Sequence, residues 1–478
     1  MSPPFAPRLR ADLLVEPGAD GVVVTDPLLR RRLNLGDIGD VLDRLDGRPV
    51  EALSPTGGLA DPRTEQVVRT LLLLSMLEGA GEPERARLRR SAPLPLVTLP
   101  SARFSCQGSG GCCRNYIFGP LTDADVARVE ALDLSAFDLG SGPFYTTRPR
   151  PDGKVDRYLQ TTAAGACRFL EAGDRCGLHT RFGGASKPGF CQLFPLVAWQ
   201  TVTGLRVYDG GECVSFPASA SGATIAAAWE DVRGLVPEPP LSNPVVHLAP
   251  GAPCDLAWFL PVLDALVTRV ADDASPVATL RGIGAGLTAA ITSLRRCPLT
   301  EDGPRAAAAA ARDAARDAAA LDAVAAPGAR VEEGRVEEGR AAIVAISRAL
   351  AEIFAAPLSG PGAAPPYTAE IVAALRRLED AAGGGPALPA EDPATRALWA
   401  LAFRQRLFGQ RALVDGRPRP AALRLCFDWL VARACPAGER AGHLLAARRL
   451  DMPWQPVHRL FLQAESALEP VLDALDTL

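Results

Sequence analysis

The chain has 478 residues, of which 48% are hydrophobic and 22% are charged. This composition is typical of a globular protein, and the length is too great for one core, so we expect several domains. The formal net charge of -4 gives no general electrostatic case for binding nucleic acid or an anionic membrane surface. The chain opens without the apolar segment of a signal peptide, and its strongest apolar run, 70–77, is too short to span a bilayer. We therefore expect a cytoplasmic protein with no membrane partner and with nucleic acid as a disfavoured ligand.

Residues 9–92 are predicted to form a small N-terminal domain. Two β-like runs, 12–16 and 21–25, flank a turn predicted at Pro17-Gly18. Apolar residues recur at i, i+3, i+4 and i+7 from Ile38, which predicts a short helix with one apolar face. A hairpin followed by helices on this scale indicates a winged-helix-like domain.

A second helix of this domain is predicted to have Asp61 as its N-cap and Pro62 at its first position, and to end at Gly79. The charged stretch 82–90 is interpreted as a link to the next domain. The order of hairpin and helices resembles the PqqD-like peptide-recognition fold. That resemblance implies that a substrate peptide adds a strand to the edge of the sheet. The alternative, a small accessory domain without a ligand, stays open.

Seven of the eleven cysteines fall within 108 residues of the next predicted domain, 93–220. Clustered cysteines in a reducing cytosol are more often metal ligands or redox groups than disulfides. A zinc ion and a 4Fe–4S cluster each take four thiolates, so seven leave a surplus. The surplus would serve a second metal, act as redox or catalytic thiols, or pack in the core. The predicted metal ligands are Cys106, Cys112, Cys113, Cys167, Cys176, Cys191 and Cys213.

Two local signals accompany the first cysteines. The adjacent Cys112 and Cys113 can serve one site only if the backbone turns there, which Gly110-Gly111 permits. Just beyond them, Thr122 is predicted as the N-cap of a helix, and Asp125 completes a variant of the capping box.

The rest of the cysteine domain is predicted to be rich in loops. Residues 140–154 read as a loop, and 158–216 contain short apolar runs and many glycines. We therefore expect little core in 158–216 and expect metal ligation to supply the missing stability. His179 follows Cys176 by three residues, so it is either a ligand or a hydrogen-bonding group that positions a neighbouring thiolate or the backbone.

The C-terminal half is predicted to contain two helical regions, 221–355 and 367–478. The alanine-rich stretch 305–326 predicts a strong helix, whereas the repeat RVEEGRVEEGR at 330–340 is interpreted as a solvated linker. The arginines from residue 394 onward are interpreted as solvated helix faces. The predicted fold class is α+β, with a small winged-helix-like domain, a loop-rich cysteine-cluster metal domain and a mostly α-helical C-terminal half.

Two apolar segments of this half need an interpretation. The stretch 254–270 is apolar but contains two aspartates, so we expect a buried helix. The pattern GIGAG at 282–286 is the nearest match to a cofactor loop for S-adenosylmethionine, but close helix packing is the favoured interpretation.

Several pieces of the cysteine domain follow one another in a characteristic order: F-x-C…CCR…LTxxD, then ACRFL, RCGLH and KPGFCQLFP. Together they resemble the YkgJ-type cysteine-cluster family, which is described as zinc- or iron-chelating and includes Fe–S-cluster proteins. Flagellin lysine N-methylases are similar to this family. The resemblance covers Phe104 to about Pro217 and implies ligand roles for the seven clustered cysteines. Ser109 stands where the family's first piece has its second cysteine, which leaves the number of metal atoms open.

Three functional hypotheses follow, of which the third, a nucleic-acid-binding regulator that uses the winged-helix-like domain, is disfavoured by the acidic balance of the chain. In the first, the chain binds an iron-sulfur cluster or zinc and acts on, or organises, a protein or peptide substrate. For an enzyme, the resemblance implies a protein-lysine N-methyltransferase that uses S-adenosylmethionine. In the second, zinc holds the cysteine-rich domain together, and the protein is a non-enzymatic scaffold or metal-handling protein. The sequence assigns no catalytic residue and leaves open whether the chain is an enzyme.

Overall fold

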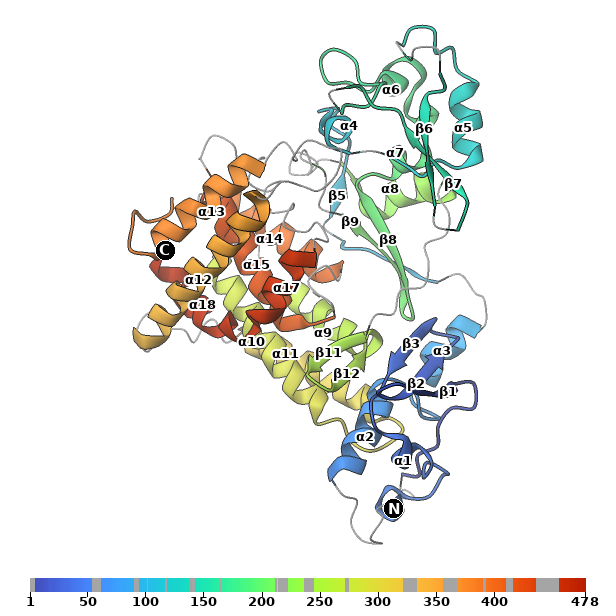
Figure 1. The fold of residues 1–478 in the computed structure, drawn as a ribbon, viewed down its shortest axis with the longest axis vertical. Coiled ribbons are helices and arrows are strands. Elements are labelled where there is room, and N and C mark those ends of the chain that lie inside the picture. Colours follow the sequence, from blue (N-terminus) through green and yellow to red (C-terminus); the bar gives the residue numbers. More distant parts are fainter. Residues whose placement is uncertain are drawn as a thin grey trace.

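The computed structural model has an α+β fold whose C-terminal half is mostly helical, which confirms the predicted fold class at this level (Figure 1). Figure 1 shows the N-terminal sheet (blue) and the cysteine-bearing part (teal to green) at opposite ends of one side, with the helical half along the other. The described residues are 5–53, 62–89, 94–100, 102–116, 118–137, 139, 142–150, 152–163, 165–210, 213, 222–235, 245–270, 275–320, 333–355, 368–389, 393–409, 416–435 and 455–478.

The N-terminal sheet is antiparallel, with the strand order β1 (Leu14–Gly18), β2 (Gly21–Asp26) and β3 (Arg31–Asn34). Its first two strands confirm the predicted β-like runs. The predicted turn at Pro17-Gly18 is wrong, because both residues pair with β2 and the chain turns at Ala19-Asp20. Proline is tolerated in β1 because this strand lies at the edge of the sheet.

Short helices follow the sheet: α1 (Gly39–Leu42), a 3-10 turn (Val50–Leu53), α2 (Pro62–Leu73) and α3 (Glu82–Arg89). Helix α2 begins at Pro62 as predicted, whereas the predicted N-cap, Asp61, lies outside the described residues. The helix ends well before Gly79, because Ser75 has a left-handed φ of 54°. The charged stretch predicted as a link to the next domain forms α3 at Glu82–Arg89, whose buried Arg85 donates hydrogen bonds to the carbonyls of Ser75 and Ala80.

The cysteine-bearing part combines short helices with one hairpin: α4 (Gly111–Asn115), α5 (Asp123–Glu130), β6 (Tyr145–Pro149), β7 (Val155–Leu159), α6 (Gly177–Phe182) and α7 (Gly189–Leu193). The capping box at the start of α5 is confirmed in both directions. The prediction of a loop at 140–154 is wrong where β6 lies, because this strand pairs with β7 along its whole length. The segment 158–216 has more core than predicted, since Leu159, Phe169 and Leu178 are buried together.

A second sheet connects the cysteine-bearing part to the helical half. It has the order β4 (Leu96–Val97), β9 (Gly204–Asp209) and β8 (Leu196–Thr201), and a two-stranded pair of β5 (Arg103–Phe104) with β10 (Ala223–Thr224) precedes α8 (Ile225–Val232). Arg206 of β9 is buried and donates hydrogen bonds of 3.0 and 2.7 Å to the Asp264 carboxylate. Its guanidinium also lies 4.8 Å from the centre of the Phe408 ring.

The helical half begins with a hairpin and continues as a packed set of helices around the largest core. Its elements are β11 (Val245–Ala249), β12 (Ala252–Asp255), α9 (Leu256–Arg269), α10 (Pro276–Arg295), α11 (Gly303–Ala320), α12 (Glu333–Ala355), α13 (Thr368–Ala382), α14 (Pro393–Phe408), α15 (Pro418–Arg433), α17 (Gln455–Gln463) and α18 (Leu468–Ala474). The alanine-rich helix is confirmed as α11, and residues 321–326 of that prediction lie outside the described residues. The predicted buried helix is confirmed as α9.

Two predictions for this half are wrong. The repeat at 330–340 is no linker where it is described, because α12 begins at Glu333 and Gly339 packs against Pro470, although five of its eight described residues are exposed as expected. The arginines beyond 394 are not all on solvated faces, because Arg406 and Arg424 are buried. Arg406 forms an ion pair with the fully buried Asp428, which makes its burial tolerable.

Helix α10 contains the GIGAG pattern, and the favoured interpretation of close packing is confirmed. A Cβ on Gly284 would lie 2.6 Å from a side-chain carbon of Leu472, and one on Gly286 would lie 2.6 Å from Leu266. Among the described helices, α10 has the length and apolar composition to cross a membrane, but 56% of its apolar window is buried inside the fold. The core helix of a soluble protein can have the same length and apolar composition.

Candidate metal centre

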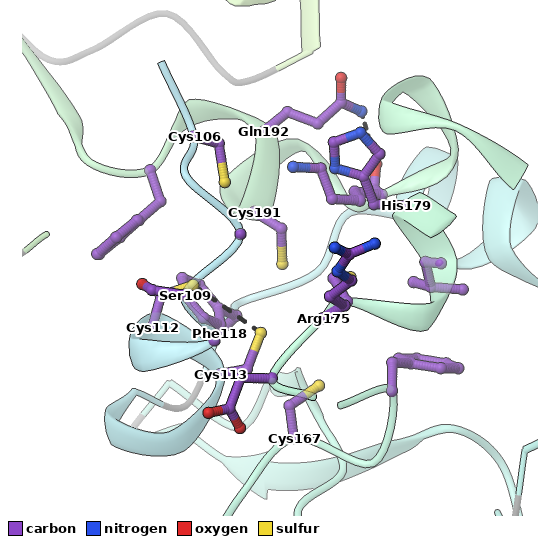
Figure 2. Close-up of a pocket in the computed structure, with 18 of the residues that line it drawn as sticks. Cys106, Ser109, Cys112, Cys113, Phe118, Cys167, Arg175, His179, Cys191 and Gln192 are labelled. Carbon is purple, nitrogen blue, oxygen red and sulfur yellow. Dashed lines mark hydrogen bonds between the residues drawn. The ribbon is translucent and has the colours of Figure 1, made fainter. Parts of the chain in front are cut away.

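The seven clustered cysteines line a single cavity of about 330 Å³ in the cysteine-bearing part. Figure 2 shows the sulfurs of Cys106 and Cys191 directed into this space from one side, and those of Cys112, Cys113 and Cys167 from the other. The remaining cysteines, Cys254, Cys297, Cys426 and Cys435, are buried elsewhere and are absent from the described lining of this cavity. The structure thus brings together all seven residues that the sequence singled out.

Helix α4 carries the adjacent pair Cys112 and Cys113 on one wall. Its N-cap, Gly110, has a left-handed φ of 64°, and this turn lets both sulfurs face the cavity, 3.9 Å apart. A Cβ on Gly110 would lie 2.5 Å from the carbonyl oxygen of Asp174. Arg114 of α4 forms an ion pair with the Asp174 carboxylate, so the two loops are held in direct contact.

Cys167 and Cys176 are held through backbone hydrogen bonds by the segment between β7 and α6. The N–H of Cys167 donates to the carbonyl of Cys113 at 2.7 Å, which joins this segment to α4. Cys176 pairs with Leu170 in an isolated bridge and is the N-cap residue of α6.

Cys191 lies on α7, and the capping box of α5 positions that helix. Asp125 Oδ1 accepts a 2.7 Å hydrogen bond from the N–H of Gly189, the first residue of α7. The same oxygen accepts a 2.7 Å bond from Arg128. Although burial opposes ionisation, the bonds from Gly189, Thr122 and Arg128 hold the pKa of Asp125 below its ordinary value.

The outer part of the cavity holds Cys106, Cys213 and Ser109. Cys106 is exposed, and Cys213 is half-buried. Ser109, which occupies the place of a cysteine in the family pattern, lines the cavity and is exposed. The five other cysteines are half-buried or buried, and four of them lie in or at the start of α4, α6 and α7. We call these five the inner thiols, and Cys106 and Cys213 the outer two.

Aromatic rings pack beneath the inner thiols. Phe118, Phe169 and Phe194 line the cavity, and Phe118 and Phe194 meet edge to face with their centres 5.6 Å apart. These rings lower the local polarity, and in such surroundings an uncompensated thiolate is costly.

The inner thiols have different proton affinities. Hydrogen bonding with Cys113 lowers the pKa of Cys112 to about 7 and the pKa of Cys176 to about 6. The same hydrogen bonds raise the pKa of Cys113, which keeps its proton. Burial raises the pKa of Cys167 to about 11 and raises that of Cys191 well above its ordinary value. Without a cation, this group therefore cannot be fully ionised at neutral pH.

The cavity is also lined by polar residues to which the sequence analysis gave no role at the site. They include Arg175, Lys187 and Gln192, and Figure 2 shows the guanidinium of the exposed Arg175 directed into the space between Cys191 and His179. The His179 ring lines the cavity and is exposed, while its backbone N–H stabilises the Cys176 thiolate. The sequence does contain one signal for Lys187, because it is one of only two lysines in the chain.

Within the described residues, no three His, Cys, Asp or Glu side chains already stand in the arrangement that binds one metal ion. The Cys112–Cys113 separation of 3.9 Å is close to the sulfur spacing of about 3.8 Å that tetrahedral Zn–S bonds of about 2.3 Å require.

Comparisons with known proteins identify no relative of this chain. No protein-family model, no curated protein and no solved structure matches the chain. The resemblance to the YkgJ-type family therefore depends on the motif residues alone.

Proposed function

We propose that the cysteine cavity holds a metal centre, and that a 4Fe–4S cluster is the best candidate for it. The observation that supports this proposal is the convergence of seven thiols, from separate segments of the chain, on one cavity of about 330 Å³. A cluster takes four thiolates around a body larger than a single ion, and the inner five thiols offer such a set. The chemistry of these donors fits, because soft thiolates select iron-sulfur clusters and zinc over hard cations.

In this proposal Cys112, Cys113, Cys167, Cys176 and Cys191 supply the ligands. A thiol loses its proton when it binds a metal. The metal's positive charge would therefore stabilise the thiolates of Cys113, Cys167 and Cys191, whose pKa values are raised. A bound cluster supplies one-electron redox chemistry or a site for cofactor binding. The aromatic rings beneath the site lower the local polarity, and the surplus Cys106 is exposed.

A zinc site is the second candidate, favoured by the 3.9 Å separation of the Cys112 and Cys113 sulfurs. Zinc would join α4 to the other segments that carry cysteines and stabilise the fold. The protein would then be a scaffold or metal-handling protein and not an enzyme.

The resemblance to flagellin lysine N-methylase adds a more specific version. In it, a lysine of a protein or peptide substrate is methylated from S-adenosylmethionine beside the metal centre. The GIGAG pattern gives this version no support, because it lies inside α10. Binding of labelled S-adenosylmethionine, followed by methyl incorporation over a panel of candidate substrates, tests it. Failure of both would remove the methylase version and leave the metal centre standing.

The PqqD-like resemblance suggests where such a substrate would be recognised, namely along β1. This strand forms an edge of its sheet, and its Leu14 and Val15 are 58% and 44% exposed. An edge strand offers unpaired backbone groups to an extended peptide.

Metal analysis under anaerobic conditions tests the central proposal. We expect about four irons with matching sulfide and a brown protein absorbing near ~400 nm, whereas zinc would be colourless. Replacing Cys112 and Cys113 together by alanine should abolish binding. The matched control is Cys426→Ala, which removes a fully buried cysteine of α15 far from the cavity. A purified chain without iron or zinc would refute the proposal, and equal loss of metal in the control would refute the assignment of the site.

A further inference from the structure

We propose that Lys187 and Arg175 place two permanent positive charges against the metal–thiolate centre, and that these charges set its stability and its reduction potential. The inference rests on the proposed function. Four thiolates around a zinc ion, or around an oxidised 4Fe–4S core, carry a net charge of about −2. In an apolar cavity such a charge is costly unless nearby groups of opposite sign offset it.

Lys187 is placed to do this. It lines the cavity and is half-buried on the turn before α7. Its backbone carbonyl accepts a 2.6 Å hydrogen bond from Gln192, so the position of the residue is fixed independently of its charge. The hydrogen bond with Cys113 is the main reason that the pKa values of Cys112 and Cys176 are lowered, and the positive charge of Lys187 is a smaller one. No hydrogen bond or ion pair joins the Lys187 ammonium to another group among the described residues.

Arg175 contributes the second charge. The other arginines around it are paired with carboxylates: Arg114 with Asp174, Arg128 with Asp125, and Arg181 with Glu171. Arg175 has no such ion pair within the described part of the chain, and its guanidinium is directed into the cavity (Figure 2). Asp174 is the one carboxylate among the described lining residues, and it faces Arg114. The mouth of the cavity therefore carries an excess of positive charge that faces sulfur.

The amino-acid composition makes Lys187 conspicuous. The chain holds two lysines, Lys154 and Lys187, against a total of 51 lysines and arginines. Lys154 is exposed near the β6–β7 turn and provides a matched control for removing one lysine charge.

The experiment compares Lys187→Gln, Lys187→Arg and Lys154→Gln in the metal-loaded full chain. If iron is bound, the measurement is the reduction potential by spectroscopic redox titration. If zinc is bound, it is the zinc affinity by competition with a chelator at fixed pH. Lys187→Gln should shift the potential to more negative values, because adding an electron to an anionic centre becomes harder, or should weaken zinc binding by about tenfold. Lys187→Arg should restore most of the effect, and Lys154→Gln should leave both quantities unchanged.

The outcomes separate this inference from the proposal beneath it. If the wild-type chain holds no metal, the proposed function fails and the charge inference falls with it. If the wild type holds metal and Lys187→Gln matches it, the inference alone is overturned. If Lys187→Arg behaves like Lys187→Gln, the shape of the side chain matters and not its charge, which also overturns it.

Discussion

The replacement of Gly110 by alanine tests how the cavity is assembled. Gly110 has a left-handed φ of 64°, which costs an L-residue about 1–2 kcal/mol. Its added Cβ would also lie 2.5 Å from the Asp174 carbonyl oxygen, and such overpacking costs about 1–3 kcal/mol more. The loop carrying Cys112 and Cys113 must then move away from the loop carrying Cys176. We expect metal binding to weaken, because the two groups of thiols no longer face one another at the proper distance.

Gly108→Ala is the matched control. Gly108 lies in the same loop with a φ of 65°, but an added Cβ would meet nothing within 4 Å. Both variants carry the backbone strain, so their difference isolates the contact with Asp174. That difference of about 1–3 kcal/mol corresponds to a roughly five- to 150-fold loss of metal affinity. The assay is metal retention against a chelator series, with circular dichroism to verify folding. Equal affinities in the two variants would refute the idea that this contact closes the cavity.

Two further predictions concern stability. Asp125→Ala should lower the free energy of unfolding by about 2–4 kcal/mol, because it leaves the Gly189 N–H without its charged acceptor. The pKa of Asp125 is lowered in the folded state, so its contribution to the free energy of unfolding is present above about pH 4 and is lost as the pH falls further. Urea denaturation of the wild type and the variant at several pH values should therefore show the difference in stability vanishing in acid. Gly334→Ala should stabilise α12 by about 0.5–1 kcal/mol, because nothing lies near its added Cβ. Gly339→Ala should destabilise the protein by about 1–3 kcal/mol, because its Cβ would lie 1.9 Å from the Pro470 carbonyl oxygen; thermal denaturation that ranks the two variants the other way would contradict this packing.

Local signals in the sequence predicted those features of the fold that a few neighbouring residues determine. The capping box from Thr122 to Asp125 needs only side chains three residues apart, and it forms as expected. The glycine turn before Cys112 is similarly local, and it turns the backbone as the adjacent cysteines require. In each case the deciding interaction lies within one turn of helix.

Features that depend on distant partners could not be predicted in the same way. The two glycines of the charged repeat at 330–340 have the same local sequence, yet only Gly339 meets another segment, at Pro470. Arg406 resembles any arginine of a solvated helix face until the fold brings Asp428 against it. Periodicity and composition contain no information about such pairings, since the partner is chosen by the packing of helices far apart in the chain.

The cysteine cavity depends both on local signals and on contacts between distant residues. The cysteines are apparent in the sequence, but the residues that bring them together are a glycine and two aspartates outside any ligand pattern. Gly110 allows one wall to approach Asp174, and Asp125 holds the first residue of α7 beside them. Both contacts join segments that lie far apart in the chain, so the local patterns that identify the cysteines do not identify the residues that gather them.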